Sequence, residues 1–244
     1  MNKKATLLIK NLEAIYTMDV HNGVDVIYHH ACIAIHHDKI LQISEKFDQT
    51  LMDKDTRIID ARGHFAIPAF IEAKGKITKN ENYPLALQQY LNHSDYFKHG
   101  IVTIALSDQK KCYVETEIVP YREHASYPIV DARQIFCNRQ KFTKKQFCIS
   151  TYHEHTNIHD GLLLARLLYT TYALNEMILT KAMTRYPAKR LGLCKQGYLK
   201  KGMQADILLC KGKELYQLFD TFDYRGFDQI IKKGIRVYPS VIRS

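Results

Sequence analysis

The densest group of side chains able to bind a metal ion is a histidine-rich stretch in the second half of the chain. His153 and His155 flank Glu154, and His159 and Asp160 follow closely. If this segment is extended, His153 and His155 lie on one face and can reach one metal together, because alternate residues of a strand point the same way. The alternative is a polar loop whose histidines are solvated or cap a helix beginning near Asp160. The spacing does not match a standard zinc signature.

A second candidate is the lysine pair Lys74 and Lys76, directly after the apolar run 69–73. On a strand these two side chains share a face. A lysine in a pocket can act as a base or a Schiff-base nucleophile, and two neighbouring ammonium groups each disfavour charge on the other. The pair could instead clamp a phosphate or a carboxylate. A third reading is that the lysines pair with carboxylates such as Glu72 or Asp131, or face open water.

Composition and charge narrow the class of protein. The chain has 244 residues, of which 46% are hydrophobic and 25% charged, which is typical of a folded globular protein. The formal charge is +10, but the lysine pairs are spread from residues 3–4 to 232–233 and form no single basic block of the nucleic-acid-binding kind. No apolar run is long enough to span a membrane, and the amino-terminal residues do not resemble a secretory signal. We therefore expect a cytoplasmic protein whose lysines lie in solvated loops rather than in a nucleic-acid-binding patch. The alternative is that they cluster in space and bind an anionic ligand or a nucleic acid.

The cysteines predict no metal or disulfide framework. None belongs to a CxxC pair, and single cysteines inside apolar runs are usually buried thiols. The six are Cys32, Cys112, Cys137, Cys148, Cys194 and Cys210.

Both ends of the chain are rich in β-type patterns. Near the amino terminus these are strands over 6–11 and 15–18, a hairpin over 31–43, and two strands within 57–68. The carboxyl-terminal part contributes a strand over 205–210 and a hairpin over 229–238 that turns at Lys233-Gly234.

The middle of the chain alternates apolar strands with helical patterns, which indicates βαβ units. The run 101–106 is continuously apolar, as expected of a buried strand in a parallel sheet. The other expected elements are strands at 69–73, 129–130 and 146–151, helices at 83–99, 161–174 and 176–186, and a helical turn at 188–193.

A family resemblance begins at residues 67–76, which read Ile-Pro-Ala-Phe-Ile-Glu-Ala-Lys-Gly-Lys. This stretch resembles the first barrel strand of metal-dependent amidohydrolases, written PGFIDxHxH, in which both histidines bind the metal. Lys74 and Lys76 stand where those histidines would be. A protonated ammonium group has donors and no lone pair to offer a cation.

The tail carries a second resemblance. Residues 184–193 and 197–209 are similar to the amidohydrolase ending TxNPAxxLGL…GxIxxGxxADLVL, and residues 224–234 resemble the narrower ending of imidazolonepropionases. The resemblance covers about residues 6–106 and 145–238.

For the fold, the resemblance implies an α/β protein with a composite β-sandwich from both termini and a TIM-like barrel between them. A complete barrel of this type takes about 250 residues, so at most about four or five βα units fit between residues 69 and 180. We expect a reduced barrel remnant over 68–186 and a sandwich made from 1–67 and 187–244. The central units that carry the family's later metal-binding histidines have no counterpart here.

For the site, the resemblance implies a zinc or iron ion and a final aspartate after the last barrel strand. Tyr152 stands at the place of that aspartate. Metal-dependent hydrolysis needs a cation, an open coordination position and a base, and the replaced residues supply none of these. We therefore expect no bound cofactor and name Lys74, Lys76 and Tyr152 as candidate ligand-binding residues.

Three functions remain open. The first is a non-catalytic descendant that binds a small anionic metabolite or a protein partner, and the chemistry favours it. The second, by descent, is an imidazolonepropionase-like hydrolase of cyclic C–N bonds. The third is a rebuilt metal site at His153, His155 and His159. Because a partial barrel leaves strand edges and apolar faces uncovered, we also expect a homodimer.

Overall fold

The computed structural model describes residues 3–75, 96–106, 117–120, 126–131, 146–151, 160–222 and 226–238. The chain forms two compact units. The first comprises Met1–Ala69 and Tyr198–Ser244, and the second comprises Phe70–Gly197. In the described residues, no helix is both long and apolar enough to cross a membrane.

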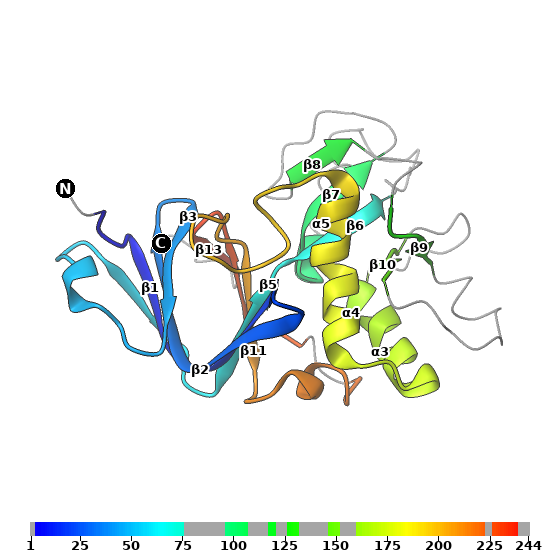
Figure 1. Cartoon of the computed structure of the whole chain (residues 1–244), viewed down its shortest axis with the longest axis horizontal. Coiled ribbons are helices and arrows are strands. Elements are labelled where there is room, and N and C mark those ends of the chain that lie inside the picture. Colours follow the sequence, from blue (N-terminus) through cyan, green and yellow to red (C-terminus); the bar gives the residue numbers. More distant parts are fainter. Residues whose placement is uncertain are drawn as a thin grey trace, which may run out of the picture. The chain divides into compact units, whose positions relative to one another are not determined.

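Strands from both ends of the chain build one sheet in the first unit. Along the sheet their order is β13-β12-β11-β5-β1-β2-β3, with β4 beside β1. Figure 1 shows the carboxyl-terminal β11 beside β5, and these strands pair antiparallel from His64–Lys211 to Pro68–Ile207. The strands are β1 (Leu7–His21), β2 (Val24–His36), β3 (Lys39–Ser44), β4 (Arg57–Asp60), β5 (His64–Pro68), β11 (Ile207–Lys211), β12 (Gln229–Lys232) and β13 (Ile235–Tyr238), and the short 3-10 helices are η1 (Gln49–Leu51) and η2 (Leu215–Leu218).

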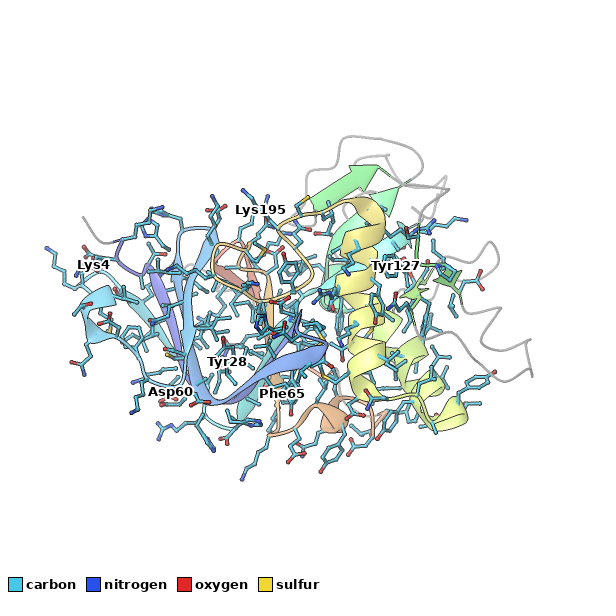
Figure 2. All side chains as sticks on the ribbon, in the orientation of Figure 1. Lys4, Tyr28, Asp60, Phe65, Tyr127 and Lys195 are labelled. Atoms are coloured by element: carbon cyan, nitrogen blue, oxygen red, sulfur yellow. The ribbon has the colours of Figure 1, made fainter. Side chains whose placement is uncertain are left out.

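Alternating side chains bury both faces of this sheet. On one face Leu7, Ile9 and Ile33 join the larger apolar core, while on the other Leu8 and Cys32 belong to a smaller one. The smaller core is covered by partly buried side chains of the segment that follows β3, namely Phe47, Leu51 and Met52. The Phe65 side chain, labelled in Figure 2, is fully buried and meets the ring of Tyr16 edge-on at 5.7 Å. Period-two burial on two faces explains the β pattern of the chain ends.

The hairpin expected at Lys233-Gly234 is confirmed, between β12 and β13. Gly234 has a φ of +74°, and a Cβ there would lie 1.8 Å from the carbonyl oxygen of His37. Only glycine accepts this backbone conformation and this close approach without strain.

The second unit combines parallel strands with helices. The strands β6, β7 and β8 form one parallel sheet, and β9 pairs with β10 in parallel. Its elements are β6 (Phe70–Gly75), β7 (Ile101–Leu106), β8 (Glu117–Pro120), β9 (Ile129–Val130), β10 (Cys148–Ile149), α3 (Gly161–Tyr172), α4 (Glu176–Met183) and α5 (Arg185–Leu191). The mixed α/β class expected from the sequence is confirmed, whereas the sandwich and the barrel remnant stay predictions.

Helix α5 packs on the parallel sheet of the second unit. Ile71 of β6 and Ala105 of β7 share an apolar cluster with Ala188 and Leu191 of α5. The compact unit accordingly runs on to Gly197, while the sequence-based boundary was drawn at residue 187. Nearby, the ring of Tyr127, labelled in Figure 2, stacks on Tyr186 of the same helix, with centroids 5.2 Å apart.

Candidate functional site

The candidate site lies at the carboxyl end of β6, which carries Lys74, the first residue of the predicted lysine pair. Ile71 packs toward α5, so Glu72, the next residue, lies on the opposite face of the strand. The side chain of Lys74 is half-buried. In folds built from parallel strands and helices, ligands bind at the carboxyl ends of the strands.

Glu72 is the central side chain of this site and is only 2% exposed. One carboxylate oxygen, Oε1, accepts a hydrogen bond from the backbone N–H of Lys74 at 3.0 Å. The other, Oε2, accepts from the backbone N–H of Thr151 at 2.9 Å and from its hydroxyl at 2.7 Å. Both oxygens are therefore already bound by donors of the protein itself.

Ser150 and Thr151, directly after β10, complete this network. The Ser150 hydroxyl donates to the backbone carbonyl of Lys74 at 2.9 Å. Ser150 is fully buried and Thr151 is 3% exposed. The network thus joins the carboxyl ends of β6 and β10.

Burial raises the pKa of the Glu72 carboxyl, because removing a charge from water is costly. The hydrogen bonds from Thr151 and from the Lys74 N–H oppose this by stabilising the ionised form. A buried carboxyl group with these hydrogen bonds is typical of a residue that stabilises the local structure rather than of a solvent-exposed catalytic base.

The buried thiol of Cys148, whose pKa is affected by the Glu72 charge, is inert at neutral pH. Burial raises the pKa of Cys148 to about 12, with Arg190 lowering it and Glu72 raising it further. Since the thiolate is the reactive species, Cys148 is not a nucleophile here. Cys32 and Cys210 are buried as expected, but Cys194 is exposed, so the expectation of buried thiols is wrong for that residue.

Several of the predicted site residues fall outside the part of the chain that the structure describes. These are Lys76, Tyr152, His153, His155 and His159. Just beyond them, the helix start expected near Asp160 is confirmed, because Oδ1 of Asp160 caps α3 by accepting from the Leu163 N–H at 3.0 Å. The other Asp160 oxygen lies 3.5 Å from Nδ1 of His99.

Sequence reasoning named Glu72 only as a possible partner of the lysine ammonium groups. In the structure its carboxylate accepts a hydrogen bond from the backbone amide of Lys74. Ser150 and Thr151 were not named as site residues at all. The one sequence feature that pointed to this network was an acidic residue, Glu72, inside the apolar run 69–73. Its partner Thr151 could not be predicted, because it is 79 residues away in the chain.

Several known structures to which this chain is similar belong to the amidohydrolase superfamily. The chain is similar to an adenosine deaminase from Xanthomonas campestris with bound zinc, at a TM-score of 0.68 and 10% identity over 97% of this chain and 93% of that one. It is also similar to a triazine hydrolase variant, at 0.64 and 11% identity over 94% of each chain. A β-aspartyl dipeptidase from Fervidobacterium islandicum AW-1 gives a TM-score of 0.58 at 12% identity over 97% of each chain.

At these identities the likeness shows the fold alone, which the chain shares with these structures. No family model and no curated protein sequence matches the chain.

The described donors at the end of β6 do not suit the zinc ion of the adenosine deaminase structure. Zinc is held by lone pairs of imidazole nitrogen, thiolate sulfur or carboxylate oxygen. The ammonium of Lys74 has none when protonated, and both Glu72 oxygens already accept hydrogen bonds. Within the described ranges, no three His, Cys, Asp or Glu side chains lie close enough together to hold a metal ion.

Proposed function

We propose that this protein is an amidohydrolase-fold relative of imidazolonepropionases that binds a small anion and does not carry out metal-dependent hydrolysis. The observation that supports it is that both carboxylate oxygens of Glu72 already accept hydrogen bonds from the protein itself. A carboxylate that is packed out of solvent and accepts three hydrogen bonds inside the protein is not available to ligate a metal.

Lys74 gives this place a positive charge at the strand end where ligands bind in related folds. A half-buried ammonium attracts an anion more strongly than one in open water, because the local dielectric constant is lower. A phosphate or a carboxylate offers the acceptor oxygens that a lysine binds. The proposed ligand is therefore a small phosphate- or carboxylate-bearing molecule.

Measuring the metal content of the protein tests the proposal that it does not carry out metal-dependent hydrolysis. Tag-free protein is analysed by mass spectrometry for zinc and iron, before and after each metal is offered. We expect far less than one metal per chain and no hydrolysis of an imidazolone substrate. Stoichiometric metal that is lost when His153, His155 and His159 are all changed to Ala would overturn the proposal and favour a rebuilt hydrolytic site.

Anion binding is tested by isothermal titration calorimetry with inorganic phosphate and, separately, with acetate. We expect Lys74→Met to weaken binding of the preferred anion at least about tenfold, the equivalent of about 1.4 kcal/mol. Lys98→Met, which removes an exposed lysine of the same unit, is the matched control and should change little. Equal affinities for the wild type and Lys74→Met would contradict the proposed site.

A further inference from the structure

The strand that carries Lys74 is irregular at that residue. Along β6 and β7, Glu72 is paired with Ile104, but the next pair is Gly75 with Leu106. Three steps along β6 thus match two along β7, which is a β-bulge around Ala73 and Lys74. A bulge interrupts the ladder and turns the local side chain to a new direction, so alternation alone does not set where Lys74 points.

Two side chains form hydrogen bonds with the backbone N–H and the backbone carbonyl of Lys74 at this bulge. The Lys74 N–H is bound by Glu72 at 3.0 Å, and the Lys74 carbonyl is bound by the Ser150 hydroxyl at 2.9 Å. Glu72 is itself anchored by two hydrogen bonds from Thr151. The backbone of Lys74 is therefore clamped from both sides by buried groups.

We infer that Glu72 is a positioning residue, which holds the bulge and thereby sets the direction of the Lys74 side chain toward a bound anion. The inference rests on the proposed anion site. A carboxylate is suited to this role because two backbone N–H groups, which cannot reverse, point at its two different oxygens. A glutamine amide can accept on only one side, so it must lose one of these bonds.

Charge and position make opposite predictions for Glu72→Gln. Removing a negative charge near Lys74 should tighten anion binding if Glu72 acts only through its field. If Glu72 holds Lys74 in place, the same change should weaken phosphate binding, and we expect a loss of about five- to tenfold. Glu45→Gln, which alters an exposed glutamate of the first unit, is the matched control and should leave affinity unchanged.

Ser150→Ala tests the same clamp without any change of charge. It should also weaken phosphate binding, because the Lys74 carbonyl loses its hydroxyl partner. In a double-mutant cycle, Glu72→Gln combined with Lys74→Met should bind no more weakly than Lys74→Met alone, since Glu72 acts through Lys74. Additive losses would show that Glu72 acts elsewhere and would overturn the inference.

Hydrogen exchange of the Lys74 amide gives a readout that needs no ligand. Followed by nuclear magnetic resonance on folded protein together with the Thr151 amide, both should exchange slowly in the wild type, and at least one should exchange at least tenfold faster in Glu72→Gln. Unchanged exchange of both amides would overturn the positioning role. Phosphate affinity that is insensitive to Lys74→Met would instead overturn the anion site, so the two failures are distinguishable.

Discussion

The ammonium of Lys232 lies 3.0 Å from the carboxylate of Asp206, and each of these side chains is only 7% exposed. The same Asp206 oxygen accepts from the amide nitrogen of Gln204 at 2.7 Å, and its other oxygen accepts from the Lys233 N–H at 2.8 Å. One buried carboxylate thus joins the start of β11 to the turn between β12 and β13. Such a pair is costly to break from one side, because the remaining charge is left buried without its counter-charge.

Lys232→Met should therefore lower the free energy of unfolding by about 3–5 kcal/mol. Chemical denaturation followed by circular dichroism measures it. Lys211→Met, at an exposed position of β11, is the control and should cost less than about 0.5 kcal/mol. Equal losses in the two variants would mean that the ion pair does not stabilise the sheet.

Glu72 should make stability depend on pH in a defined direction. Its pKa is raised in the folded state, so the folded protein binds the proton more tightly than the unfolded chain does. The stabilisation from this group is then fully present below its unfolded pKa and is lost as pH rises through the raised folded value. The stability advantage of the wild type over Glu72→Gln should shrink from pH 4 toward neutral pH.

Urea denaturation of both proteins across this pH range checks the sign. Across this range Glu72→Gln should have the lower free energy of unfolding. The difference should be about 1–3 kcal/mol, because one buried donor is left without an acceptor. An advantage that grows with pH would contradict the raised pKa.

Gly234 should tolerate no side chain. Gly234→Ala places a Cβ against the His37 carbonyl at a backbone φ of +74°, and we expect a loss of about 3 kcal/mol or more from clash and strain together. Gly202→Ala is a matched control, because its φ is +84° but nothing lies within 4 Å of the added Cβ. It should cost only the backbone strain, about 1 kcal/mol. Thermal unfolding separates the two, and similar melting temperatures would refute the close approach.

The cysteines should differ in reactivity. At pH 8 iodoacetamide should alkylate the exposed Cys194 and leave Cys148 unmodified, because Cys148 is buried and its pKa is raised to about 12. Peptide-level mass spectrometry of the folded protein measures each site. Labelling of Cys148 at a rate similar to that of Cys194 would argue against its burial beside Glu72.

Local patterns predicted many elements well. The apolar run 101–106 is β7, and the helix expected over 161–174 is α3, which ends at Tyr172 because Ala173 takes a left-handed conformation with φ of 51°. Other boundaries were wrong. The two short strands expected at 6–11 and 15–18 are one strand, β1, which continues through a bulge after Ile9.

The helix expected to begin at Glu176 is confirmed as α4, but it ends at Met183 and not at residue 186, because Thr184 has φ and ψ of −128° and −78°. Pro187 then falls in the first turn of α5, where a proline is tolerated because its missing N–H has no partner to lose.

The sequence by itself determined that both ends of the chain are rich in strands, that strands and helices follow one another between them, where the Lys233-Gly234 turn falls, and that lysine stands where the resembled strand has a histidine. These features depend on side-chain periodicity and on the conformations open to residues near one another in the chain. Only the tertiary structure decided that β5 lies beside β11 and that Glu72 bonds to Thr151, 79 residues away. Such contacts depend on how the whole chain packs and on where buried polar groups find partners, which no local pattern specifies.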